Sequence, residues 1–215
     1  MPEIFALSIV ILLFSVILHE VMHGLAALYF GDSTAQRAGR LTLNPLPHID
    51  PIGTILLPAI ILLPAFLTGT PPGPLLAWAK PVPINPLNFS NIRRGELYVS
   101  AAGIVANFGL AILFALIYRI LDALPMVFPD SLGGVLRYGV QVNLLLGVFN
   151  LFPIPPLDGS KILLSQLPYK LAKEYQKLER YGFLILVFLI FIFPAPIFII
   201  LNFFVRLLSR LLLGY

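Results

Sequence analysis

The sequence predicts an all-α protein that crosses a lipid bilayer several times. Of its 215 residues, 59% are hydrophobic and only 11% are charged, whereas soluble domains are roughly 45–50% apolar and about 25% charged. Several apolar runs are long enough to cross a hydrocarbon layer of about 30 Å as helices. We therefore expect one membrane-embedded domain over residues 1–215. It should have about five to six membrane segments around a three-helix core, with a short extended or re-entrant stretch.

Composition also limits the classes of function. The formal net charge is +4, but no basic stripe is interleaved with aromatic residues, so a nucleic-acid partner is not expected. The chain contains no cysteine, which excludes disulfides and metal sites with cysteine ligands. The start of the chain, Met1-Pro2-Glu3, has no basic segment of the kind that opens a signal peptide. The lipid bilayer is therefore the first predicted partner.

The first predicted span covers residues of about 4–30 and contains the motif His19-Glu20-Val21-Met22-His23. Helix residues four apart project from one face, so both imidazoles can reach one zinc ion at about 2.0–2.1 Å. Glu20 is placed to take a proton from a zinc-bound water without binding the metal itself. The motif alone has limited specificity, but no charged residue lies between Ile4 and Leu18. A metal site inside the membrane is therefore the favoured interpretation.

Proline interrupts the next part of the chain. Residues 33–51 are polar, and their last nine residues contain three prolines, which forbid a regular helix. Residues 52–68 are apolar but contain Pro58 and Pro64, which predicts either a kinked span or a re-entrant element. Residues 77–86 contain Pro81, Pro83 and Pro86 and should be extended. Backbone of this kind at membrane depth must be covered by protein or line a watery cavity.

Two further spans, at residues of about 97–121 and 135–152, should complete the three-helix core with the first span. Both carry amides: Asn107 in the first, and Asn143 and Asn150 in the second. Such groups are costly in lipid unless they have partners. Asn143 favours a hydrogen bond between helices, whereas Asn107 fits either that role or the active site. Residues 182–215 are apolar around Pro194 and Pro196, which predicts one long kinked span or two short helices.

The distribution of cations predicts the orientation. Five Lys or Arg side chains lie within residues 160–181, and Arg37, Arg40, Arg93 and Arg94 precede the later spans. Short basic loops face the cytoplasm. This places the histidine pair in the cytoplasmic half of the first span, at about the depth of Asp158. The candidates for a third ligand are His48, Asp50 and Asp158. Asp158 is favoured, because a carboxylate beside membrane-embedded prolines needs a strong reason to be there. His48 is more simply interpreted as a loop histidine that binds backbone or solvent.

The sequence resembles the site-2 protease family of intramembrane zinc metalloproteases, in particular its small prokaryotic branch without a PDZ domain. Four stretches within residues of about 15–160 carry the resemblance. They are His19-Glu20-Val21-Met22-His23, Leu43 to Gly53, Trp78-Ala79-Lys80-Pro81-Val82-Pro83, and Asn150 to Gly159 with its Asn-Leu-Phe-Pro-Ile-Pro-Pro-Leu-Asp-Gly sequence. The first and last are highly specific together. One departure is Ser160, where the family often has a second glycine.

The resemblance implies an activity and a set of site residues. It implies a zinc metalloendopeptidase with one Zn²⁺ per chain that hydrolyses peptide bonds in or near transmembrane helices of substrate proteins, as in regulated intramembrane proteolysis. Glu20 would be the catalytic base, and Asp158 would join His19 and His23 as metal ligands. Asn150 would hydrogen-bond the substrate backbone, and the helix containing Asn107 would lie beside the site. The expected location is a prokaryotic cytoplasmic membrane, with the active site toward the cytoplasm.

Two other classes of function remain as alternatives. A transporter or metal-handling protein would need further ionisable residues along the spans, and the sequence has few. A pseudoprotease that binds membrane partners without cutting them would not need Glu20. Residues 77–86 add a hypothesis about the substrate, because an exposed strand edge could pair with an unwound substrate segment.

Overall fold

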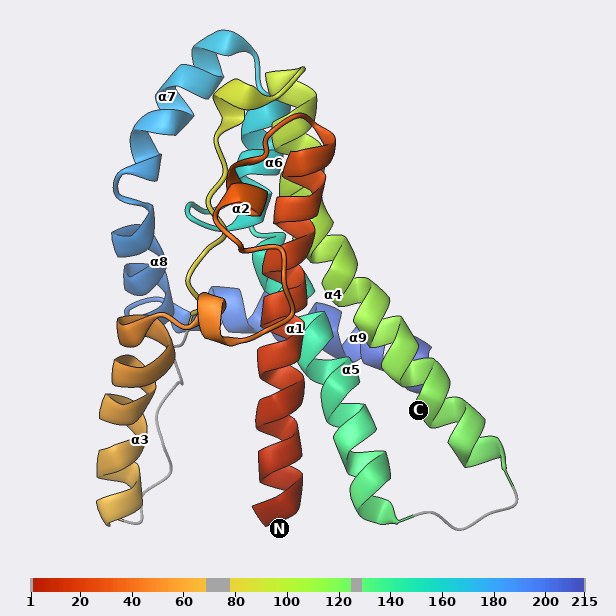
Figure 1. Cartoon of the computed structure of the whole chain (residues 1–215). Coiled ribbons are helices and arrows are strands. Elements are labelled where there is room, and N and C mark those ends of the chain that lie inside the picture. Colours follow the sequence, from red (N-terminus) through yellow and green to blue (C-terminus); the bar gives the residue numbers. More distant parts are fainter. Residues whose placement is uncertain (1, 69–77, 125–128, 215) are drawn as a thin grey trace.

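The computed structural model describes residues 2–68, 78–124 and 129–214, and this part of the chain is helical with no strand (Figure 1). Among these residues, four helices are long and apolar enough to cross a membrane. They are α1 (Pro2–Tyr29), α4 (Ile92–Ala123), α5 (Asp130–Asn150) and α9 (Pro194–Leu213). Two shorter apolar helical stretches, Pro51–Ile60 and Gly182–Phe191, accompany them. The all-α polytopic fold is confirmed.

Helices α1, α4 and α5 pack together as the predicted three-helix core (Figure 1). The two later helices begin about five residues earlier than the apolar runs suggested. The helix α4 starts at Ile92 because the side chain of Asn91 accepts a hydrogen bond from the backbone N–H of Arg94, and such caps satisfy free donors at a helix start. The helix α9 packs against α5 and α4. Its Leu213 joins a buried apolar cluster with Ala111, Ala115, Val140 and Leu144.

The polar segment after α1 is compact. It contains α2 (Thr34–Arg37) and the short helix η1 (Leu46–His48). Asp50 then caps η2 (Pro51–Leu56), a π-helical turn that runs directly into α3 (Leu57–Thr68). Pro64 lies inside α3. Residues 51–68 therefore form one helical element that contains proline. In Figure 1 this element lies at the same height as the N-terminal half of α1.

Residues 78–85 are extended, as predicted, and end in the short helix η3 (Pro86–Asn88); Ala77 lies outside the described residues. Four backbone N–H groups of this extended segment donate hydrogen bonds to other parts of the protein. The pairs are Trp78 to the Gly53 carbonyl (3.2 Å), Lys80 to the His48 carbonyl (2.9 Å), Val82 to Glu20 Oε2 (2.9 Å) and Asn85 to Asp32 Oδ2 (2.7 Å). The segment is thereby attached to α1 and the residues just beyond it, and to η1 and η2.

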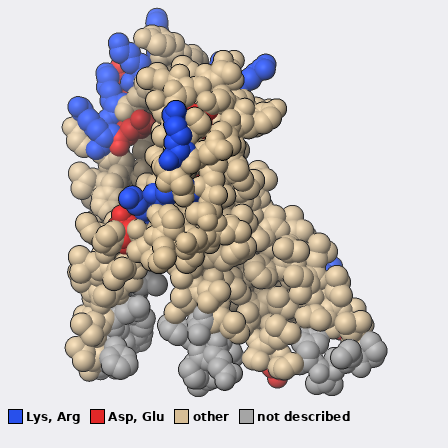
Figure 2. Space-filling view, viewed as in Figure 1, with Lys and Arg blue, Asp and Glu red and all other residues tan. Residues whose placement is uncertain are grey.

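The C-terminal third consists of α6 (Asp158–Gln166), α7 (Tyr169–Glu179), α8 (Gly182–Phe191) and α9. Residues 182–213 thus form two helices, the second of the two predicted alternatives, and the break precedes Pro194. Lys and Arg side chains gather at the end of the molecule where α6 and α7 lie (Figure 2). The C-terminal end of α1 and the start of α4 lie at this same end (Figure 1).

Candidate metal centre

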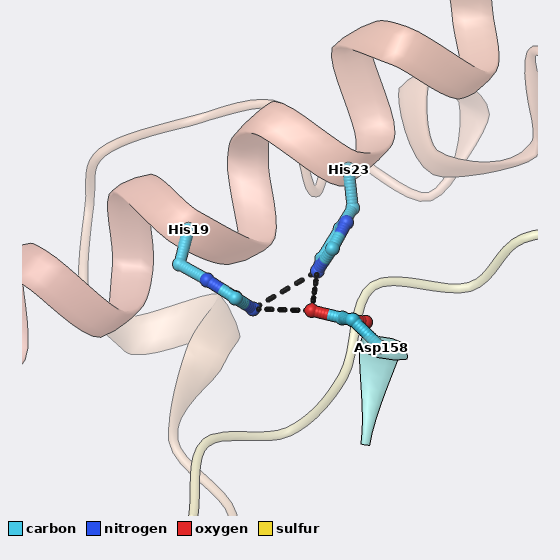
Figure 3. Close-up of side chains that lie close together, drawn as sticks. All are labelled: His19, His23 and Asp158. Atoms are coloured by element: carbon cyan, nitrogen blue, oxygen red, sulfur yellow. Dashed lines mark hydrogen bonds and ion pairs between the residues drawn. The ribbon is translucent and has the colours of Figure 1, made fainter. Parts of the chain in front are cut away.

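Three predicted ligands meet where α1 faces the start of α6 (Figure 3). The Nε2 atoms of His19 and His23 are 3.0 Å apart, and each lies 3.2 Å from Oδ2 of Asp158. All three residues are buried. The helical spacing of the two histidines and the turn that ends α5 bring these groups together. The other two candidates for a third ligand lie elsewhere: His48 Nε2 is bonded to the Thr42 carbonyl, and Asp50 caps η2.

The hydrogen bonds around the histidines determine which ring nitrogens carry the protons. His19 Nδ1 lies 2.7 Å from Asn107 Oδ1, and His23 Nδ1 lies 2.7 Å from the Val99 carbonyl. Both partners are acceptors, so each Nδ1 donates, and in the neutral rings each Nε2 presents a lone pair. Oδ2 of Asp158 is buried without a hydrogen bond in the described chain. Three electron-pair donors therefore converge on one point.

This arrangement fits a bound cation. Without one, two lone pairs and a carboxylate oxygen would repel one another at 3.0–3.2 Å. Two ligand atoms on a tetrahedral zinc ion, each at about 2.0–2.1 Å, are about 3.3 Å apart. The observed triangle is thus close to one face of such a tetrahedron, and a zinc ion held there would keep a fourth ligand position for water or substrate. Two imidazoles with one carboxylate are also a ligand set that zinc uses in catalytic sites.

A chain of buried polar side chains holds His19 from behind. Asn107 Nδ2 donates to Asn143 Oδ1 at 3.1 Å, and Asn143 Nδ2 donates to Ser15 Oγ and to the Gly139 carbonyl, both at 2.9 Å. All three polar side chains are fully buried. Because the Gly139 carbonyl can only accept, each amide has one consistent orientation, which directs Asn107 Oδ1 at His19. The prediction that Asn143 bonds between helices is confirmed. The amide of Asn107 is engaged inside the protein, so its predicted contact with substrate stays a prediction.

Gly103 on α4 forms the surface beneath both imidazoles. A Cβ at this position would lie 2.6 Å from Cε1 of His19 and 2.6 Å from both Cε1 and Nε2 of His23. The sequence predicted that the helix containing Asn107 lies beside the site, but the contact of Gly103 with the histidines was missed. The spacing of Gly103 and Asn107, one turn apart, was the available signal, because it puts both on one face of the helix.

The two remaining predicted site residues have defined surroundings. Oε2 of Glu20 accepts the Val82 N–H at 2.9 Å, and the structure shows no hydrogen bond to its other oxygen among the described residues. Asn150 ends α5, and its Nδ2 donates to the Leu146 carbonyl at 3.0 Å. Its side-chain oxygen has no hydrogen bond within the described chain. The catalytic role of Glu20 and the substrate role of Asn150 stay predictions.

Asp32, just beyond α1, is a buried carboxylate. It accepts hydrogen bonds from Thr34, from the backbone of Asn85 and from the side chain of Asn88. Burial by itself would raise the pKa of Asp32, but these hydrogen bonds outweigh it and lower the pKa to about 2. The ionised carboxylate thus attaches the far end of the extended segment to α1.

Comparison with known proteins identifies the family. The model of peptidase family M50 matches residues 125–193. A protein of Bacillus subtilis named "Putative zinc metalloprotease YwhC" is 37% identical over 193 residues, which cover 88% of this chain and 80% of the relative. A protein of Mycolicibacterium smegmatis named "Putative zinc metalloprotease Rip2" is 34% identical over 198 residues, covering 89% and 69%. No solved structure matches. The chain is an integral membrane protein that belongs to peptidase family M50, the site-2 protease family.

Proposed function

We propose that this protein is an intramembrane zinc metalloprotease that hydrolyses peptide bonds in or near transmembrane helices of substrate proteins. The observation that carries the proposal is the convergence of His19, His23 and Asp158 beside Glu20, within the apolar helical core. The names of the relatives support zinc as the metal. When bound, zinc would lower the pKa of a water ligand toward about 7 and polarise the scissile carbonyl.

The residues of this chain divide the remaining work. Glu20 accepts the proton of the attacking water and passes it to the leaving amine. The Val82 N–H holds one of its oxygens at 2.9 Å and leaves the other for this exchange. Asn150 forms a hydrogen bond with the substrate backbone. Buried apolar surroundings exclude bulk water and strengthen these polar contacts.

The distribution of charge supports an orientation. The cations of α7 lie at the end of the molecule that also holds the C-terminal end of α1 (Figures 1 and 2). Basic loops favour the cytoplasmic side. We therefore place the metal centre in the cytoplasmic half of the membrane. The bacterial relatives support a prokaryotic cytoplasmic membrane as that membrane.

The extended segment is our candidate for the site that binds an unwound substrate. The N–H groups of Trp78, Lys80 and Val82 are occupied inside the protein. Residues between them face the other way in an extended chain. On that outer edge, Ala79 supplies an N–H that has no partner among the described residues, whereas Pro81 and Pro83 lack one. The Pro81 carbonyl on that edge already accepts a hydrogen bond from Arg40. A substrate strand would therefore be held at Ala79, through its N–H.

Trp78→Ala tests this substrate edge. The Trp78 ring packs against Phe183 and directly on Gly53, so its loss frees the start of the segment. We expect KM for a transmembrane substrate to rise about tenfold, since one or two lost backbone contacts are worth about 0.5–1.5 kcal/mol each, while the zinc content stays unchanged. Leu87→Ala is the control, because Leu87 is 82% exposed just beyond the segment. Unchanged KM in folded Trp78→Ala would exclude the edge role.

Metal removal tests the proposed function itself. Purified protein in liposomes is given a labelled transmembrane substrate, with chelator, without it, and with zinc restored. We expect chelation to abolish cleavage and zinc to restore it, with the cut mapped by mass spectrometry to the substrate's membrane segment. Cleavage at an unchanged rate in the presence of chelator would contradict the mechanism. Metal flux without cleavage would indicate the transporter alternative, and substrate binding without cleavage the pseudoprotease.

A further inference from the structure

We infer that Arg40 is a positioning residue for Glu20 and acts through the peptide group between Pro81 and Val82. The inference rests on the proposed function, because it assigns Glu20 the role of base. From the sequence, Arg40 was expected only to mark the cytoplasmic side of the membrane.

Arg40 is a buried cation that has no acidic partner among the described residues. It follows α2, and only 7% of its surface is exposed. The ion pairs among the described residues join His19 or His23 with Asp158, and Lys177 with Glu174. A buried charge is costly unless other groups compensate it. The compensation here comes from backbone: Nη2 of Arg40 donates to the Lys80 carbonyl at 2.6 Å and to the Pro81 carbonyl at 3.3 Å.

The second of these carbonyls belongs to the same peptide group that contacts Glu20. The Pro81 carbonyl accepts from Arg40, and the Val82 N–H donates to Glu20 Oε2 at 2.9 Å. This peptide is trans, since the described cis bond is Pro155–Pro156. Its carbonyl and N–H therefore point in opposite directions, which puts Arg40 and Glu20 on opposite sides of the segment. A cation on the carbonyl also polarises the amide and strengthens its N–H as a donor.

The surroundings leave this peptide little freedom. Proline at positions 81 and 83 restricts the backbone on both sides of Val82. The Val82 side chain is buried, and its Cγ1 would lie 3.1 Å from a Cβ at Gly24, one turn beyond Glu20 on α1. These restraints leave open the rotation about the bond between Cα and the carbonyl carbon of Pro81, which turns the peptide itself, and the hydrogen bond from the guanidinium to the Pro81 carbonyl holds this rotation. With Arg40 in place, one oxygen of Glu20 stays bonded to the Val82 N–H, and the other can accept the proton of the attacking water.

The test compares Arg40→Met with Arg40→Lys and with Arg37→Met. Arg37 is an exposed cation three residues earlier, so its variant controls for loss of charge. We expect Arg40→Met to lower kcat about 10²-fold, the cost of misplacing a catalytic group by about 1 Å. KM and zinc content should stay within about twofold of wild type. Arg40→Lys should recover part of the loss, because an ammonium can donate to the same carbonyls.

Two further measurements identify the route through Glu20. In a Glu20→Gln background, Arg40→Met should cause little additional loss, since both changes act on one step. Hydrogen exchange of the Val82 amide should accelerate in Arg40→Met and stay slow in Arg37→Met. A rise in KM at unchanged kcat, loss of zinc, or additive losses in the double variant would overturn the inference. If wild type with zinc cleaves nothing, the proposed function fails, and unchanged Val82 exchange would separately reject the contact.

Discussion

Glu20→Gln lowers the turnover of a transmembrane substrate by about 10²–10⁴-fold, the range that general base catalysis contributes, while one zinc ion per chain is retained. The amide has nearly the same shape as the carboxylate but cannot accept the proton. Its oxygen can still accept a hydrogen bond from the Val82 N–H, as Oε2 of Glu20 does at 2.9 Å in the native protein. The extended segment therefore stays in place, and the loss reports proton transfer alone.

The measurement is single-turnover cleavage in liposomes together with zinc content by mass spectrometry. Glu174→Gln is the control, because Glu174 lies on α7, pairs with Lys177 and is mostly exposed. Full activity in Glu20→Gln would remove Glu20 from the mechanism. Loss of zinc would instead show that the carboxylate supports the metal site, for which the present geometry gives no reason.

The proximity of the three candidate metal ligands could be predicted from sequence because the two halves of the site depend on local rules. Helical spacing alone brings His19 and His23 to one face. Asp158 follows a proline-rich turn, where an intramembrane carboxylate is expensive and so indicates function. Neither of these two signals depends on how the helices pack against one another. The long spans could be predicted for the same reason, because each one is an apolar run long enough to cross the membrane. Their exact ends depend on capping residues such as Asn91.

The contacts behind the centre could not be predicted in this way. The chain from Ser15 through Asn143 and Asn107 to His19 spans three helices, and it depends on how those helices rotate about their axes. The bond from Val82 to Glu20 depends on where an extended segment lies, and no periodic pattern encodes that position. Arg40 was misleading for a further reason: a cation in a short loop indicates topology, whereas this one is buried against backbone carbonyls.

Gly103→Ala should strongly weaken zinc binding, the second large effect that the structure predicts. The new Cβ would lie 2.6 Å from three atoms of the His19 and His23 rings, a separation that carbon atoms do not tolerate. Either the rings rotate or α4 moves away from α1. Rotation breaks the bonds from Nδ1 to Asn107 and to the Val99 carbonyl, which measure 2.7 Å each. Since such bonds orient metal ligands, zinc affinity should fall about 10–100-fold or more.

Gly109→Ala is the matched control for this prediction. It lies six residues later on the same helix, and nothing lies within 4 Å of a Cβ built there. It makes the same change in helix propensity, so it should retain zinc and be neutral or slightly stabilising. Zinc affinity by competition with a chelator, and thermal unfolding of the apo proteins, separate the two possible responses. Weak zinc binding with native stability indicates rotated rings, whereas lower stability of the apo protein, by about 1–3 kcal/mol, indicates displaced helices. Native zinc affinity in Gly103→Ala would mean that α4 does not support the histidines. In that case, the chain of amides that ends at Asn107 could not position His19 either, because both contacts come from the same face of α4.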